Sequence, residues 1–365
     1  MDRIFELRNN QIKKKRLNPK QAGDDCDEFR SEMFKRVVGQ AEAVEALVAM
    51  YQKNKMRMTP LRQPIGSLLF MGPTGSGKTR TIEAAADTLF GDSYAMIKID
   101  CAEFQHSHEI SKLIGSPPGY LGHRETPPIL TQDNLDRWHS KNIKLTLVLF
   151  DEIEKASDAL WQLLLAVLDK AALTLGDNRK VDFSRCIVTM TSNLGAREME
   201  NWIGGGIGYR STKDRDKSHS SLRSIALKAA KRKFSPEFIN RLDEIVVFNY
   251  LDQNMLRKIV EIELQFVQKR VLWSGGGNFV VKFGDSLVDY LVEVGFDPKY
   301  GGRFLKRMIE RLVILPITNL MATKQIGIGE VLEVEFDTKL GQVAFFKASL
   351  ESEVLSKDQK AASKP

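Results

Sequence analysis

The eight residues from Gly72 to Thr79, GPTGSGKT, constrain this chain more than any other stretch. They match G-x-x-x-x-G-K-[ST] at every fixed position, between an apolar run (65–72) and a helical pattern (80–90). In that setting glycines let backbone N–H groups close around phosphate oxygens, and the helix N-terminus adds a favourable dipole. We expect Lys78 to reach the β- and γ-phosphates of ATP and Thr79 to bind Mg²⁺. The nucleotide-binding residues predicted here are Gly72, Pro73, Thr74, Gly75, Ser76, Gly77, Lys78 and Thr79.

Such a phosphate site also needs a carboxylate for Mg²⁺ and a base for the attacking water, and the stretch LTLVLFDE (145–152) offers both. Asp151 ends an apolar strand, so it projects at the carboxyl edge of a sheet, where ligands bind in open α/β folds. We therefore predict Asp151 as a metal ligand and Glu152 as the residue that polarises the water. Asn193 ends the next apolar run, MTSN (190–193); it reaches the same water or the γ-phosphate, or it forms a turn.

Apolar runs and helical patterns alternate along the first two thirds of the chain. Strands are predicted at 65–72, 94–100, 144–152 and 185–193, and helices at 80–90 and 159–171. Because these strands are apolar throughout, they indicate a parallel sheet with both faces covered, in an α/β fold. From Leu251 the pattern changes to a smaller α+β unit, with helices at 252–271, 285–294 and 301–323 and strands at 279–283, 330–336 and 342–346.

The charge and the cysteines limit the partners and the compartment. A formal net charge of +7 suits nucleic acid, but basic residues at 13–16 and in the last ten positions favour solvated tails instead. Three widely spaced cysteines, Cys26, Cys101 and Cys186, argue against a disulfide framework and fit a reducing cytosol. The sequence shows neither an apolar run of membrane-spanning length nor a secretory signal, so we expect a cytoplasmic location without a membrane partner.

Taken together, the motifs resemble the AAA+ ATPases of the Clp type, in particular the second ATPase module of ClpA, ClpB and ClpC. The resemblance covers about residues 33–346, and the motifs keep the family order: VVGQAEAVEAL (37–47), GPTGSGKT (72–79), LIGSPPGYLG (113–122), VLFDEIEKA (148–156), TSNLGA (191–196), FSPEFINRLDEIVVF (234–248) and YGGRFLKRMIE (300–310). It implies a P-loop NTPase AAA+ large domain at 33–249, with a parallel five-stranded sheet between helices. A small α+β C-terminal domain is expected at 250–347, a polar tail or helix at 1–32, and a disordered tail at 348–365.

The resemblance also implies roles for single residues. Val37 and Val38 look like the segment that packs on adenine, and Asn193 looks like the sensor of the γ-phosphate. Arg303 looks like a second sensor that the small domain brings to the phosphates. Arg241 looks like an arginine finger that acts on the nucleotide of a neighbouring subunit, which implies a homo-oligomeric ring of six. The alternative for Arg241 is a surface salt bridge to Asp243 or Glu244.

The loop with the sequence GYLG (119–122) resembles the loop that lines the central channel of such rings. There Tyr120 and Leu121 would contact unfolded or misfolded polypeptide, because an aromatic surface binds diverse side chains without sequence demands. The alternative is a structural turn with Tyr120 packed into the core. His123 stands where the family often has a second aromatic residue, so the strength of the contact could differ.

Another loop, IGGGIGY (203–209), lies where ClpA and ClpC carry the segment that docks on the peptidase ClpP. It matches that segment only approximately, so a mobile surface loop is favoured over docking of a ClpP-like peptidase. The chain has no room for an N-terminal substrate-binding domain or a first ATPase module, so we expect a single-module protein.

The function predicted is an ATP-dependent protein unfoldase or remodelling chaperone, with ATP and Mg²⁺ as cofactors. The alternative is a nucleic-acid motor with the same ATP site, since fold does not fix function. Such a motor would place lysine or arginine at the tip of the channel loop, where Tyr120 and Leu121 stand here, although Arg124 is close by. A nucleotide-gated scaffold with little hydrolysis is a third hypothesis, and the intact set of Lys78, Asp151, Glu152 and Arg241 argues against it.

Overall fold

The computed structural model describes residues 17–18, 22–116, 127–204, 215–274, 279–295 and 302–348. Five parallel strands form the central sheet, in the order β2 (Ile97–Asp100), β3 (Thr146–Asp151), β6 (Cys186–Ser192), β1 (Gly66–Met71) and β7 (Glu244–Val247). This confirms the predicted α/β fold with a five-stranded parallel sheet. The register aligns Asp100 with Asp151 and Met71 with Ser192, so the carboxyl ends of four strands meet at one edge.

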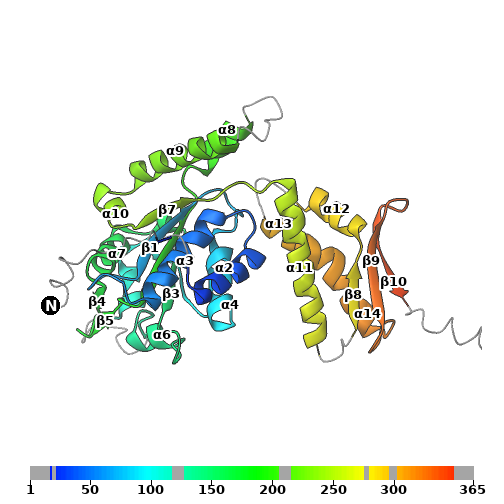
Figure 1. Ribbon diagram of the computed structural model, residues 1–365, viewed down its shortest axis with the longest axis horizontal. Coiled ribbons are helices and arrows are strands. Elements are labelled where there is room, and N and C mark those ends of the chain that lie inside the picture. The colour runs from blue at the N-terminus through cyan, green and yellow to red at the C-terminus, as the bar shows by residue number, and fades with distance from the viewer. Residues whose placement is uncertain are drawn as a thin grey trace, which may run out of the picture.

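Both faces of the sheet are covered by helices, which makes three layers (Figure 1). On β1, Leu68 and Phe70 face a core formed with α2 (Asp24–Arg36), α3 (Ala41–Lys55) and α4 (Lys78–Phe90). Leu69 and Met71 face the other core, formed with α7 (Asp158–Lys170), α9 (Arg215–Lys233) and α10 (Pro236–Asn240). Because successive side chains of a strand point to opposite faces, burial of both faces explains why the strands are apolar without alternation.

Helix α2 crosses the boundary that the sequence suggested between residues 32 and 33. Its residues Cys26, Phe29 and Met33 are buried in the large-domain core, and the ring centroid of Phe29 lies 5.0 Å from that of Tyr51 in α3. Apolar residues at positions 26, 29 and 33 share one helix face. The large domain therefore extends at least to the start of α2.

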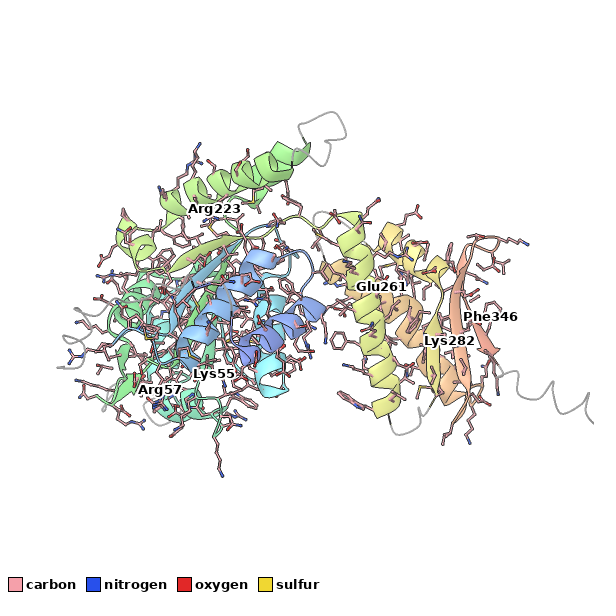
Figure 2. All side chains as sticks on the ribbon, in the orientation of Figure 1. Lys55, Arg57, Arg223, Glu261, Lys282 and Phe346 are labelled. Atoms are coloured by element: carbon pink, nitrogen blue, oxygen red, sulfur yellow. The ribbon has the colours of Figure 1, made fainter. Side chains whose placement is uncertain are left out.

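The small domain has its own core and its own three-stranded sheet. Its elements in chain order are α11 (Gln253–Trp273), β8 (Val280–Phe283), α12 (Asp285–Val294), α13 (Gly302–Ile309), α14 (Leu315–Ala322), β9 (Val331–Asp337) and β10 (Gln342–Ala348). The helix expected at 301–323 is interrupted by a π-helical turn (Glu310–Ile314). Pro316 follows that turn, and a proline inside a helix removes one backbone hydrogen bond and forces such an adjustment. Glu261, Lys282 and Phe346 lie on the surface of this domain (Figure 2).

The remaining elements of the large domain are short, apart from one arm. Helices α8 (Ala196–Gly204) and α9 project from the domain in Figure 1. The short elements are α5 (Ser111–Ile114), α6 (Gln132–Asp136), the hairpin β4 (Ala172–Thr174) and β5 (Lys180–Asp182), and the 3₁₀ turns η1 (Cys101–Phe104), η2 (Ser107–Ile110) and η3 (Ile153–Lys155). None of the described helices is long and apolar enough to span a membrane.

Candidate nucleotide site

The loop GPTGSGKT connects the end of β1 to the first turn of α4 at the carboxyl edge of the sheet. Gly72, Gly75 and Gly77 have positive φ angles of 151°, 76° and 98°, which side-chain-bearing residues rarely adopt. A Cβ atom on Gly72 would lie 2.9 Å from Cβ of Phe248. Glycine is therefore required at these positions for the loop to wrap around the start of α4, and the loop presents a cradle of backbone N–H groups.

Lys78 is the first residue of α4, and its side chain is buried under this loop. Its Nζ atom donates to the carbonyl oxygens of Gly72 and Pro73, each at 2.8 Å, and to Oδ1 of Asn193 at 2.9 Å. The last contact joins the P-loop to the end of β6. The sequence-predicted pair Lys78 and Asn193 is thus brought together.

Asp151 lies opposite Thr79. The Thr79 hydroxyl donates to the Asp151 carboxylate at 3.1 and 3.3 Å, and Nζ of Lys98 lies 3.4 Å from the same carboxylate. The hydroxyl of Thr191 in β6 also donates to it. Two oxygen-bearing side chains that meet in this way form the hard donor set that Mg²⁺ prefers.

Glu152 follows Asp151 in an unusual backbone conformation. Its φ and ψ angles are 57° and 51°, in the left-handed region, which costs a non-glycine residue free energy and tends to persist at functional sites. Its N–H donates to the Thr191 hydroxyl at 3.0 Å, and its carboxylate accepts from Nδ2 of Asn193 at 3.3 Å. Its other carboxylate oxygen pairs with Lys155, and that hydrogen bond raises the pKa of Lys155. Glu152 is held in place from both sides.

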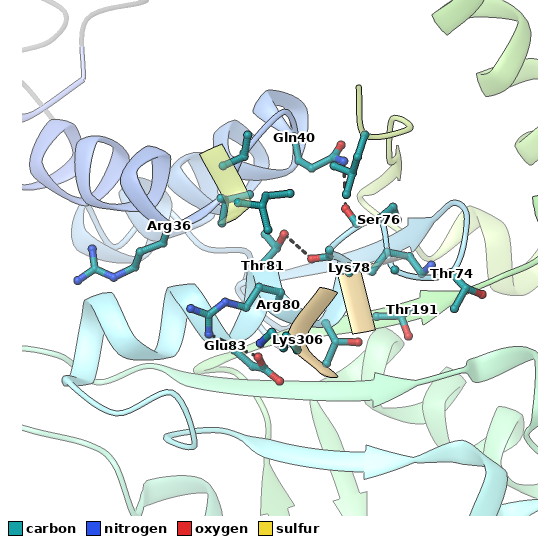
Figure 3. A pocket seen from close by; sticks show the side chains of 18 of the residues that line it. Arg36, Gln40, Thr74, Ser76, Lys78, Arg80, Thr81, Glu83, Thr191 and Lys306 are labelled. Atoms are coloured by element: carbon teal, nitrogen blue, oxygen red, sulfur yellow. Dashed lines mark hydrogen bonds and ion pairs between the residues drawn. The ribbon is translucent and has the colours of Figure 1, made fainter. Parts of the chain in front are cut away.

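These side chains line a cavity of about 280 Å³ between the two domains (Figure 3). One wall is apolar and comes from both domains: Val37, Val38, Leu251, Ile259 and Ile262. The opposite wall carries the P-loop, Asp151, Glu152 and Asn193. The cavity therefore offers an apolar surface to a base and a polar, glycine-rich surface to phosphates.

The residues present fit ATP and Mg²⁺. The Ser76 hydroxyl is buried without a hydrogen-bond partner among the described residues, which is unusual for a polar atom. It lies in the glycine cradle, next to the oxygen pair of Thr79 and Asp151. An anionic ligand in the cradle and a cation on the oxygen pair would satisfy these groups.

Gln40 was missed by the sequence analysis although it lies within the motif VVGQ. Its side chain is buried, and Nε2 donates to the carbonyl oxygens of Ser76 at 3.1 Å and Asn249 at 3.0 Å. Its Oε1 atom accepts from the N–H of Asn249 at 2.9 Å. Asn249 belongs to the segment between β7 and α11 that links the domains, so Gln40 connects the P-loop to this linker (Figure 3).

Lys98, Thr191 and Lys306 also line the cavity without having been predicted. Lys98 and Thr191 contact Asp151, as described above. Lys306 of α13 lies 3.2 Å from Glu263 of α11, so the small domain adds a third lysine to the cavity, after Lys78 and Lys98. Strand-end position was the signal available for Thr191, and Lys306 lies within the motif YGGRFLKRMIE (300–310); nothing local marked Lys98.

Arg241 lies outside this cavity. Its side chain pairs with Asp169 of α7, and among the described residues it forms no ion pair with Asp243 or Glu244. Its carbonyl oxygen accepts from the hydroxyl of Ser67 at 3.1 Å, so it lies at the amino end of β1, while the P-loop lies at the carboxyl end. Ser67 lies five positions before Gly72, a distance of about 17 Å at roughly 3.3 Å per residue along a strand. Arg241 is therefore not part of the site formed by its own chain.

The remaining predicted residues are described only in part. Arg303 lies on the first turn of α13, whose residues Gly302 and Lys306 line the cavity, but its side chain is outside the described set. Residues 117–126, with Tyr120 and Leu121, and residues 205–214, with most of the Gly-rich loop, also lie outside the described residues.

Comparison with known proteins gives matches along most of the chain. Residues 63–245 match the family described as AAA domain (Cdc48 subfamily), and residues 251–334 match the C-terminal, D2-small domain of ClpB protein. The chaperone protein ClpB of Rhodopirellula baltica is 37% identical over 305 residues, which cover 84% of this chain and 32% of that protein. ClpB of Gloeobacter violaceus is 35% identical over 311 residues, covering 85% and 33%. The chain thus spans about a third of the length of these relatives.

Solved structures of Hsp104 are similar as well. A closed-state reconstruction of Hsp104 with ATPγS and FITC casein has a TM-score of 0.73 and 28% identity, covering 89% of this chain and 52% of that chain. The extended conformation of the Saccharomyces cerevisiae Hsp104:casein complex has a TM-score of 0.74 and 28% identity, covering 89% and 53%. The large and the small domain therefore both have counterparts in known proteins, where they follow one another in the same order along the chain.

Proposed function

Because the chain belongs to the AAA domain family (Cdc48 subfamily), we propose that it binds ATP with Mg²⁺ in this cavity, hydrolyses it, and uses the energy to unfold or remodel proteins. A D2-small domain follows the AAA domain, which is the order of a Clp-type second module. The observation that carries the ATPase proposal is the convergence of Lys78, Asp151 and Asn193 at one edge of the sheet.

In the proposed reaction the ammonium group of Lys78 binds the β- and γ-phosphate oxygens, and the P-loop N–H groups surround them. Asn193 and Glu152, which hydrogen-bond to each other at 3.3 Å, hold the attacking water, and Glu152 accepts its proton. When bound to Thr79 and Asp151, Mg²⁺ neutralises charge on the phosphates. Arg303 contacts the phosphates from the first turn of α13, a role supported by the neighbouring Gly302 and Lys306 at the cavity wall.

The remodelling part of the proposal rests on the relatives. ClpB is named a chaperone, and the Hsp104 structures contain casein. On these grounds we propose that six copies form a ring, that Arg241 reaches the nucleotide of a neighbouring copy, and that Tyr120 and Leu121 contact unfolded polypeptide. The three free, buried thiols fit a reducing compartment such as the cytoplasm. Docking of a ClpP-like peptidase on the Gly-rich loop stays a prediction.

The experiment that tests this function is the ATPase rate measured with casein and, separately, with single-stranded DNA. We expect casein to stimulate the ATPase rate and single-stranded DNA to leave it unchanged. Tyr120→Ala should keep ATP binding and lose this stimulation, whereas Tyr94→Ala, at a tyrosine that is 82% exposed on the large domain, should behave as wild type. Stimulation by DNA alone would support the nucleic-acid motor instead. A chain that hydrolyses no ATP under any of these conditions would contradict the proposal.

A further inference from the structure

One face of helix α11 borders the nucleotide cavity and continues into an aromatic ring. Ile259, Ile262 and Glu263 line the cavity, and Phe266 follows one turn later. Residues three and four apart share a helix face, so Phe266 extends this row toward the large domain. The ring is half-buried, yet it does not belong to the core that the described part of the small domain forms. Packing within its own domain therefore does not explain an aromatic residue at this position.

Arg80 of the large domain covers this ring. It directly follows Thr79 in the first turn of α4, and its guanidinium carbon lies 5.3 Å from the centroid of the Phe266 ring. A guanidinium at this distance is attracted by the negative potential of an aromatic face. Nη1 of Arg80 also lies 3.6 Å from the Glu83 carboxylate, and Figure 3 shows both side chains among those that line the cavity. The contact therefore joins the helix that begins at the P-loop to the small domain.

This contact lies far from the linker that connects the two domains. Next to the linker, Met255 at the start of α11 packs so closely on Gly39 that a Cβ atom there would lie 2.5 Å from the methionine sulfur. Phe266 follows Met255 by eleven residues, or about 16 Å along the helix at roughly 1.5 Å per residue. An attraction at this distance resists rotation of the small domain about the linker more than an equal attraction beside it, because it acts over a longer lever arm.

Other charged contacts in this region stay within one domain. Nζ of Lys269 lies 5.5 Å from the centroid of the same Phe266 ring, but Lys269 belongs to α11 itself. The ion pair between Lys306 and Glu263 likewise joins two helices of the small domain. Neither contact changes when the two domains move apart. Among the residues that the structure describes, the cation–π contact made by Arg80 is the one that crosses from domain to domain.

We propose that Arg80 and Phe266 form a latch across the nucleotide cavity, and that this latch sets the rate at which bound nucleotide leaves. The apolar wall of the cavity comes from both domains, so a bound nucleotide is released when the domains move apart, which breaks the contact between the two side chains. Both are positioning residues, which hold α11 against α4 without contacting the reacting phosphates. This inference rests on the proposed binding of ATP in the cavity.

The test is the dissociation rate of the fluorescent analogue mant-ADP from the full chain with Mg²⁺, measured by displacement with excess ADP. Arg80→Gln and Phe266→Leu should each release mant-ADP about two- to fivefold faster than wild type, the usual effect of losing a partly exposed cation–π contact. The association rate and the urea midpoint of unfolding should not change, whereas a merely structural role would lower the midpoint. Phe266→Tyr keeps the ring and should behave as wild type. Lys269→Gln, which removes the cation within α11, is the matched control and should also release at the wild-type rate.

A double variant decides whether the two side chains act as one contact. Arg80→Gln combined with Phe266→Leu should release mant-ADP no faster than either single variant, since both substitutions remove the same contact. Effects that multiply in the double variant, or faster release in the Arg80 variant alone, would mean that Arg80 acts on the nucleotide directly; the latch would then be wrong, while ATP binding in the cavity stands. Wild-type release rates in all three variants would overturn the latch as well. A wild-type chain that binds no mant-ADP would overturn both the latch and the proposed function.

Discussion

At the scale of single residues, Glu152 shows how the backbone prepares the site. Its left-handed conformation turns the chain sharply after β3, so that Asp151 points toward Thr79 and Glu152 toward Asn193. Two adjacent carboxylates thereby face two different partners. These separate contacts support the proposal that Asp151 holds the metal and Glu152 acts as the base.

Replacing Glu152 with glutamine should separate nucleotide binding from hydrolysis. The amide keeps the shape of the side chain and a contact to Asn193, but it does not accept a proton. We expect the ATPase rate to fall at least about 100-fold, in line with the loss of a general base, while nucleotide affinity stays within about threefold. Asp158→Asn, at an exposed carboxylate on the same edge, is the control and should keep the wild-type rate. A Glu152→Gln variant with normal turnover would assign the base to another residue.

Sequence alone identified the residues that belong to local patterns. Lys78 and Thr79 lie in a fixed motif, and Asp151 and Asn193 end apolar strands that a parallel sheet brings to one edge. Gln40 and the partner of Arg241 could not be found in this way. Gln40 contacts Ser76 and Asn249, far from it along the chain, and Arg241 pairs with Asp169 on a helix whose end only the tertiary packing places nearby.

At the scale of elements, Gln40 connects three segments: the start of α3, the P-loop and the linker before α11. Gln40→Leu has a similar size but leaves the carbonyl oxygens of Ser76 and Asn249 without this donor. We expect the free energy of unfolding to drop by about 1–3 kcal/mol, the usual cost of a buried group left unsatisfied, and KM for ATP to rise. Urea unfolding and ATPase kinetics measure the two effects. Gln105→Leu, at an exposed glutamine, is the control; equal losses in both variants would refute a special role for Gln40.

A second element-scale prediction concerns His139, which lies between α6 and β3. Its Nε2 atom lies 2.9 Å from the Thr146 hydroxyl, which donates to the Leu135 carbonyl oxygen at 2.6 Å. The hydroxyl proton is thus used, so Nε2 carries the hydrogen and donates to Thr146. Burial lowers the pKa of His139 below its usual 6.5, although Asp136 opposes this.

The sign of the pH dependence follows from this shift. Between the lowered folded pKa and 6.5, the unfolded chain binds more protons at His139 than the folded chain. The contribution of His139 to stability is therefore complete above pH 6.5 and is lost as the pH falls through that window. Urea unfolding of wild type and His139→Gln from pH 7.5 to 5.5 should show a shallower decline for the variant. Parallel curves would contradict the assignment.

The sequence predicted the regular helices and strands better than the short hairpin and the π-helical turn. Each strand of the central sheet expected from an apolar run is present, as are the elements of the small domain. The hairpin β4–β5 was missed because its strands have only three residues each, too few for a periodic signal. The π-helical turn before Pro316 was missed because the apolar periodicity continues through it, while the backbone has to adjust.

At the scale of the whole molecule, the two edges of the central sheet carry different parts of the proposed ATPase machinery. The nucleotide cavity lies at the carboxyl edge, between the large and the small domain, whereas Arg241 lies at the amino edge. A strand length of about 17 Å keeps Arg241 away from the cavity of its own chain. If Arg241 takes part in hydrolysis, it does so in the cavity of another copy, and the active unit is an assembly.

The measurement that tests this most directly is the ATPase rate of a mixture of two variants. Lys78→Ala disables its own cavity but keeps Arg241; Arg241→Ala keeps its cavity but lacks the arginine. Each alone should hydrolyse at least about 100-fold more slowly than wild type. In an equal mixture about one contact in four joins an intact cavity to an intact Arg241, so we expect recovery to about a quarter of the wild-type rate. A mixture as inactive as its two components would contradict catalysis between neighbouring copies.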